Sequence, residues 1–149
     1  MSTPPRVAPP GWQLGPVDHV GIAVSDLDAA VRFHTEVLGL VLTHREDNPE
    51  QGVTEAMLEP QNPGDTQIQL VAPSRADSPV ARFLARRGPG LHHVAYAVAD
   101  LASASDVLRH RGVRLLYDSP RAGTRGSLIN FVHPADAGGV LVELVQPSG

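Results

Sequence analysis

The sequence predicts an α+β fold made of two tandem βαβββ modules. The segment that begins at His19 is echoed by the segment that begins at His93 (93 − 19 = 74), and the one at Gln69 by the one at Glu143 (143 − 69 = 74). The same order of strand-like and helix-like patterns also occurs in both halves. A repeat at one fixed step indicates a duplicated supersecondary unit.

The first half is predicted to contain one helix and four strands. Residues 17–24 are rich in β-branched and small residues, and Ser25 or Asp26 could cap the helix that follows. Apolar residues recur at helical spacing from Leu27 until Gly39. Strands are expected next at residues 40–46, 52–58 and 66–71.

The second half repeats this order after a short linker. A helix over residues 77–87 tolerates Pro79 in its first turn, and the following glycines end it. We then expect a strand at 91–98, a helix at 101–111 and strands at 113–117, 127–133 and 140–146.

These elements form a single domain at residues 16–147, with module one at 16–74, a linker helix at 75–88 and module two at 89–147. Residues 1–15 are expected to be a flexible proline-rich tail, because they lack the apolar run of a secretory signal. No apolar run approaches the roughly 20 residues that span a bilayer. The net charge of −4, with scattered signs, gives no reason to expect nucleic acid or an anionic membrane as a partner. The expected compartment is the cytoplasm.

Four side chains at equivalent points of the two modules could bind a metal ion. The chain has no cysteine, so nitrogen and oxygen must supply the ligands. Two imidazoles, an amide oxygen and a carboxylate suit Co²⁺, Mn²⁺, Ni²⁺ or Zn²⁺. With one formal negative charge among the ligands, the ion would remain a Lewis acid. The candidate ligands are His19, Gln69, His93 and Glu143.

Strand alternation places small residues beside both histidines. Residues two apart share one side of a sheet, so His19 lies on the side of Gly21 and His93 on the side of Ala95. The alternate positions are bulkier. We therefore expect a cavity on the histidine side and the core on the other.

Glu55 lies between Val53 and Met57 on one side of its predicted strand. A carboxylate in this apolar stripe would have a raised pKa and would accept a proton near neutral pH. Alternatively, Glu55 faces solvent and pairs with an arginine. Alternation alone leaves both interpretations open.

The loop at residues 121–126 contains two arginines and two glycines and could contact a phosphate or carboxylate. Its spacing matches no phosphate-loop motif, so a solvated connection is the favoured interpretation. The remaining histidines are interpreted as packing or surface residues, with at most His92 contacting a metal ligand. They are His34, His44, His92, His110 and His133.

Several segments, covering together about residues 16–147, carry a likeness to a known family. They are residues 17–24, 44–55, 76–84, His92-His93, His133-Pro134 and 139–144. Together they resemble the methylmalonyl-CoA epimerase family of the vicinal oxygen chelate superfamily. Paired modules with a histidine metal site would indicate only the superfamily, whereas the Asn-Pro-Glu-Gln-Gly-Val run at 48–53 and the ending with Glu143 point to the epimerases.

The resemblance implies a glyoxalase-type open barrel, an acyl-CoA substrate and a homodimer. It implies that His19, Gln69, His93 and Glu143 bind a divalent ion, often cobalt. It also implies epimerisation of (2R)- and (2S)-methylmalonyl-CoA by α-proton abstraction through a metal-stabilised enolate. Glu55 is implied as one acid-base group and Glu143 as the other, although a metal-bound carboxylate is a weaker base.

Three other functions are compatible with this type of fold. A glyoxalase I-type lyase would use a similar metal site on a glutathione hemithioacetal. An extradiol dioxygenase is disfavoured, because its iron needs open positions and Gln69 would occupy a fourth. A drug-binding protein of this fold would contain no metal.

Overall fold

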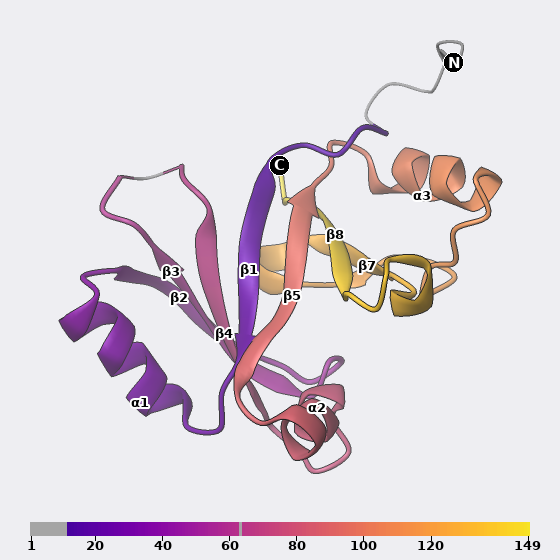
Figure 1. Cartoon of the computed structure of the whole chain (residues 1–149). Helices are drawn as coiled ribbons and strands as arrows, with labels where there is room; N and C mark the ends of the chain where they lie inside the picture. Colours follow the sequence, from indigo (N-terminus) through magenta and orange to yellow (C-terminus); the bar gives the residue numbers. More distant parts are fainter. Residues whose placement is uncertain (1–11, 63) are drawn as a thin grey trace.

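The computed structural model describes residues 12–62 and 64–149, which form one eight-stranded mixed sheet with helices packed against it. The strand order is β2-β3-β4-β1-β5-β8-β7-β6. Each half of the chain thus forms a continuous half of the sheet. The halves meet where β1 (Val17–Ala23) and β5 (Gly90–Ala97) pair antiparallel in the middle of the molecule (Figure 1).

The two halves have the same internal order. In the first, β1 pairs in parallel with β4 (Gln67–Pro73), and β3 (Val53–Glu59) and β2 (Val41–Asn48) follow antiparallel. In the second, β5 pairs in parallel with β8, followed by β7 and β6. These last strands span Val142–Gln146, Leu128–Val132 and Arg121–Ala122. The sheet curls into a half-barrel, and the predicted tandem βαβββ fold is confirmed.

The helices begin at side-chain caps. Asp26 accepts a hydrogen bond from the backbone of Ala29 at the start of α1 (Leu27–Arg32), and Asp100 does the same from Ser103 in α3 (Leu101–His110). The two aspartates are themselves one repeat step apart. The helix α2 (Pro79–Arg87) links the modules, and three shorter turns complete the elements: a π-helix at Phe33–Val37 and 3-10 turns at Thr124–Gly126 and Pro134–Asp136.

The main apolar core lies between α1 and the outer face of the first half-sheet, and α3 covers the second half-sheet in the same way. Leu27 of α1 belongs to a buried cluster with Leu58 and Leu70. Leu101 of α3 belongs to a buried cluster with Leu144. Because α1 and α3 cover the outer face, the inner face is left for functional side chains, and α2 packs at one end of it against Val53 and Val71.

The prediction of a strand at residues 113–117 is wrong. This segment runs beside β7 but makes only an isolated bridge, between Leu115 and Val132. The side chain of Asn130 takes the place of the regular ladder: it accepts from the backbone N–H of Tyr117 and donates to the backbone carbonyl of the same residue. The fourth strand of this module is instead the short β6.

Residues 1–11 of the expected tail lie outside the described residues. From residue 12 the chain contacts the second half: the guanidinium of Arg111 lies 4.3 Å from the ring centre of Trp12, and Gly15 N–H donates to the carbonyl of Ala97 over 2.7 Å. Among the described helices, none combines the length and the apolar character needed to cross a membrane.

Candidate metal centre and active site

The four candidate ligands lie in two rows across the central strands. In one row, Gly21 of β1 stands between Gln69 of β4 and His93 of β5. In the other row, His19 of β1 and Glu143 of β8 lie on either side of β5. The two rows are related by the repeat. The metal-competent side chains therefore converge from both modules onto the inner face of the sheet.

Three of these side chains are in direct contact. The Nε2 atom of His19 lies 2.9 Å from Oε2 of Glu143 and 3.2 Å from Nε2 of His93, and the latter lies 3.2 Å from the same carboxylate oxygen. All three side chains are buried. Such a group can hold a cation, because its ligand atoms all lie within 4.8 Å of one another.

Gln69 supplies a further indication of an ion. Its Oε1 atom is buried and has no hydrogen-bond partner among the described residues, while its Nε2 is engaged by Glu55 at 2.9 Å and Thr124 at 3.2 Å. An unsatisfied buried acceptor costs about 1–3 kcal/mol unless something binds it. A divalent ion held by two imidazole nitrogens and two oxygens fits this donor set.

The charges of His19 and Glu143 stabilise each other. Burial alone would lower the pKa of His19, but hydrogen bonds to Asp18 and Glu143 outweigh it and raise the pKa to about 9. Burial would raise the pKa of Glu143, but hydrogen bonds from His19 and His93 outweigh it and hold that pKa well below its usual range. A cation bound here must therefore displace a proton from His19.

Each histidine of the cluster has an outer partner. The Nδ1 atom of His19 lies 2.7 Å from a carboxylate oxygen of Asp18, and Nδ1 of His93 lies 2.8 Å from Nδ1 of His92. His92 also packs edge-on against Phe83. Burial, assisted by the charge of His93, lowers the pKa of His92 to about 4, so this ring is neutral near pH 7.

Glu55 lies inside the half-barrel and is only 4% exposed, in agreement with the first of its two interpretations. Its carboxylate accepts hydrogen bonds from Gln69 Nε2 and from the hydroxyl of Thr124. Burial raises the pKa of Glu55 to about 7, although the bond from Thr124 opposes the shift. Glu55 is thus a carboxylate poised to exchange protons near neutral pH.

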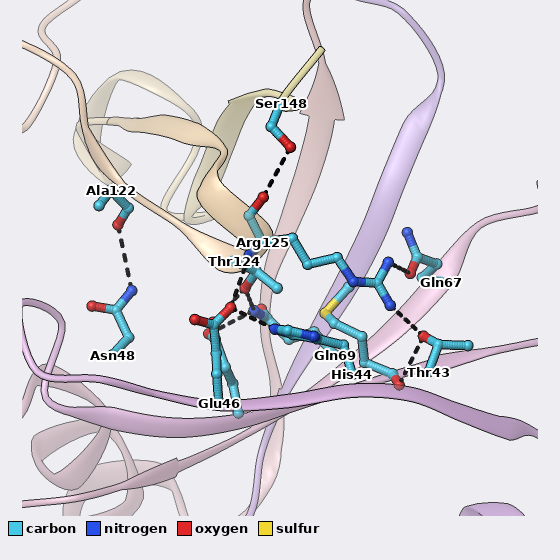
Figure 2. Close-up of polar contacts among 12 residues, drawn as sticks. Thr43, His44, Glu46, Asn48, Gln67, Gln69, Ala122, Thr124, Arg125 and Ser148 are labelled. Atoms are coloured by element: carbon cyan, nitrogen blue, oxygen red, sulfur yellow. Dashed lines mark hydrogen bonds and ion pairs between the residues drawn. The ribbon is translucent and has the colours of Figure 1, made fainter.

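The loop at residues 121–126 is mostly exposed, as expected for a solvated connection, but it also makes contacts with the first module that the sequence did not predict. Figure 2 shows Thr124 and Arg125 reaching toward side chains of β2 and β4. The backbone N–H of Arg125 donates to Glu46 over 2.8 Å, and its guanidinium bonds to Thr43 and Gln67. Arg125 has a positive φ of 57°, which aims Thr124 and Arg125 in different directions.

Two cavities reach the cluster, one on each side of Thr124. A cavity of about 130 Å³ is lined by Glu55, Gln69, His93 and Glu143 together with apolar side chains. A second cavity, of about 250 Å³, is lined by His19, Asp18 and Arg125 among others. The first cavity joins every candidate ligand except His19 to Glu55, and so it suits a partly apolar substrate.

Sequence reasoning missed Thr124 and Asp18. Asp18 and His92 stand one repeat step apart, directly before the two ligand histidines, so the repeat could have indicated them as a pair. No local signal marks Thr124. Its position depends on the contacts that Arg125 makes with the first module.

Comparisons with known proteins agree with this geometry. Residues 18–131 match the family model described as Glyoxalase/Bleomycin resistance protein/Dioxygenase superfamily. The mitochondrial methylmalonyl-CoA epimerase of Mus musculus is 38% identical over 92% of this chain and 76% of its own length. The crystal structure of methylmalonyl-CoA epimerase from Mycobacterium tuberculosis is 51% identical, with a TM-score of 0.85 and coverage of 89% of this chain and 88% of that one. A variant of the Streptomyces coelicolor epimerase in complex with 2-nitronate-propionyl-CoA is 45% identical, with a TM-score of 0.88 and coverage of 92% and 100%.

Proposed function

The chain belongs to the Glyoxalase/Bleomycin resistance protein/Dioxygenase superfamily and, within it, to the family of methylmalonyl-CoA epimerases, and we propose on this basis that it interconverts (2R)- and (2S)-methylmalonyl-CoA. The observation that carries the proposal is the buried Glu55 carboxylate, which shares a cavity with three of the four candidate metal ligands. Epimerisation requires removal and return of the α-proton, which is chemistry for such a carboxylate.

Glu55 accepts the α-proton in this proposal. Its pKa near 7 means that the ionised form is available at neutral pH and that the protonated form can return the proton. Thr124 and Gln69 fix the position of the carboxylate through hydrogen bonds. The apolar lining of the cavity excludes water that would otherwise solvate it.

The four side chains His19, Gln69, His93 and Glu143 would hold a divalent cation, with Co²⁺ as the first candidate and Mn²⁺, Ni²⁺ or Zn²⁺ as alternatives. When bound, the cation supplies a Lewis acid for the negative charge that develops as the α-proton leaves and the planar enolate forms. The Nε2 atom of Gln69 is occupied by Glu55 and Thr124, and its buried Oε1 has no partner among the described residues and could bind the ion.

Inversion at the α-carbon also needs a proton donor or acceptor on the opposite face. Glu143 is our candidate, because it lines the same cavity as Glu55 and comes from the other module. Its lowered pKa makes it the weaker base of the two. We therefore assign the two carboxylates unequal roles, with Glu55 as the stronger acceptor.

The deciding experiment is α-proton exchange of methylmalonyl-CoA in deuterated water, measured by mass spectrometry with and without added divalent ion. Exchange that depends on the ion supports the proposal. Turnover of a glutathione hemithioacetal without exchange at methylmalonyl-CoA would instead indicate a glyoxalase I-type lyase. A protein purified without chelator that neither contains nor takes up metal would indicate a small-molecule binder.

The same proposal includes a homodimer. Apolar side chains are exposed at the end of the first helix and on the edge strand β2: Phe33, Val37, Leu38, Val41 and Leu42. Contiguous exposed apolar groups commonly mark an interface. Sedimentation analysis of the protein and of Val37→Lys tests this, since a monomeric wild-type protein would rule it out.

A further inference from the structure

The outer partners of the two ligand histidines are equivalent in position and different in chemistry. Asp18 and His92 are one repeat step apart (92 − 18 = 74) and hold Nδ1 of their histidines at 2.7 and 2.8 Å. A carboxylate can only accept a hydrogen bond, whereas a neutral imidazole accepts at one nitrogen and donates at the other. The second module therefore has a donor that the first lacks.

Binding of a cation by His93 would fix which nitrogen of His92 carries the hydrogen. For His93 to bind a cation through Nε2, that nitrogen must be unprotonated, so the hydrogen of His93 lies on Nδ1. Nδ1 of His92 lies 2.8 Å away and must accept it. The hydrogen of His92 is then on Nε2. A second proton on His92 would set two N–H groups face to face.

This Nε2–H has no hydrogen-bond partner among the described residues. Among the described residues, His92 makes a side-chain hydrogen bond only through Nδ1, and its Nε2 is not one of the buried atoms that lack a partner. His92 lines the cavity of about 130 Å³ that also contains Glu55. Asp18 lines the other cavity. His92 thus lines the same cavity in which Glu55 would meet a substrate.

We propose that His92 is a substrate-binding residue of fixed tautomer, which accepts from His93 and donates its Nε2–H to an oxygen of the bound acyl-CoA. This inference rests on the proposed function for the identity of the ligand. It assigns two linked effects to one ring: orientation of a metal ligand and recognition of a substrate acceptor. The two effects can be separated by comparing a variant that keeps only the acceptor with a variant that keeps neither nitrogen.

The tautomer is tested by long-range ¹H–¹⁵N NMR of the histidines in the Zn²⁺-loaded protein, a measurement that needs no substrate. We expect His92 protonated at Nε2 and His93 protonated at Nδ1. Protonation of His92 at Nδ1 would overturn the inference, whatever reaction the protein catalyses.

The donor is tested by titrating the Zn²⁺-loaded protein with 2-nitronate-propionyl-CoA in a calorimeter. His92→Asn keeps an acceptor near the place of Nδ1 but has no donor at the place of Nε2, so the analogue should bind about 3- to 10-fold more weakly with metal affinity retained. His92→Phe keeps the ring but loses both nitrogens, and metal affinity should also fall, by about 10- to 100-fold. His110→Asn on the surface of α3 serves as the control and should change neither affinity.

The outcomes separate this inference from the function on which it rests. Wild-type protein that binds the analogue while His92→Asn binds it equally well overturns the donor role and leaves the epimerase proposal intact. Wild-type protein that holds the expected tautomer but binds no acyl-CoA analogue overturns the donor role together with the proposed function.

Discussion

At the scale of single residues, Glu55 is defined by its surroundings: a carboxylate buried on β3, with Thr124 and Gln69 as its hydrogen-bond partners. Glu55→Gln preserves size: its amide oxygen can accept from Gln69, and its amide nitrogen can donate to the Thr124 hydroxyl, so the orientation of the Gln69 amide should survive. We expect near-normal metal content and an α-proton exchange rate lower by about 10²–10⁴. Exchange assays paired with metal analysis measure both effects.

Glu59→Gln, at the end of the same strand, is the matched control and should exchange protons at the wild-type rate. If Glu55→Gln lost metal in the same proportion as activity, Glu55 would have a structural role in the metal centre and not a role in proton transfer.

His93 gives a second prediction at this scale. His93→Ala removes one nitrogen of the cluster and the hydrogen-bond partner of His92. We expect metal and exchange activity to disappear together, as measured by metal analysis after dialysis and by the exchange assay. Full metal occupancy in this variant would contradict the ligand set.

The sequence identified the four candidate ligands because the repeat relates them two by two. It could not decide which way Glu55 points, because alternation is informative only when one face of a strand is exposed. On β3 both faces are buried: Val53, Glu55 and Met57 on one side and Ala56 and Leu58 on the other. The alternation of residues in the sequence does not indicate that both sides of this strand are buried.

At the scale of secondary structure elements, the position of the His93 ring on β5 depends on a glycine of β1. A Cβ atom on Gly21 would lie 2.0 Å from Cε1 of His93, so the ring of His93 occupies the space that a side chain at this position would need. Gly21→Ala should therefore displace His93 and weaken metal binding strongly. Titration calorimetry with Zn²⁺ measures the affinity.

Gly90→Ala is the control for this change, because it lies at the start of β5 and an added Cβ meets nothing within 4 Å. It should bind metal as the wild type does. Circular dichroism of both variants verifies folding, and a folded Gly21→Ala protein with unchanged metal affinity would show that the ring of His93 does not need this space.

The helices and strands could be predicted where the local sequence pattern and the 74-residue repeat agreed. They could not be predicted where side-chain hydrogen bonds replaced pairing between backbones. The strand expected at 113–117 has suitable residues, but Asn130 satisfies both backbone groups of Tyr117 and interrupts the ladder. The path of the loop at 121–126 is likewise set by contacts with Glu46 and Thr43, which lie about half the chain away. Neither effect has a local signature.

At the scale of the whole molecule, stability should fall with rising pH in the absence of a bound ion and should not fall when an ion is bound. The folded-state pKa of His19 is raised from 6.5 to about 9, so its contribution is fully present below pH 6.5 and is lost as pH rises toward 9. The pKa of Glu55 is raised from 4.5 to about 7, so this residue also makes stability fall as pH rises, but most of that fall occurs below pH 7. The range from pH 7 to 9 therefore isolates His19.

We expect the melting temperature of chelator-treated protein to fall between pH 7 and 9. With a divalent ion at a fixed concentration of 100 times its Kd at pH 7, stability should rise by about 2.7 kcal/mol at that pH. The fall toward pH 9 should vanish, because the ion binds neutral His19 and its affinity increases as His19 loses its proton. Differential scanning calorimetry measures both series. His19→Gln should flatten the pH dependence of the chelator-treated protein, and identical slopes in both variants would refute this account.

The two ligand rows that meet across β1 and β5 also have an evolutionary consequence. An assembly of two identical single modules could bring the same positions together, but each mutation would then change both copies at once. Fusion into one chain lets paired positions diverge separately, as Gln69 and Glu143 have done, and as Asp18 and His92 have done. The position one repeat step after Glu55 is occupied by Ile129, so only one half carries this acid. Unequal chemistry on the two sides of one symmetric frame is not available to two identical modules.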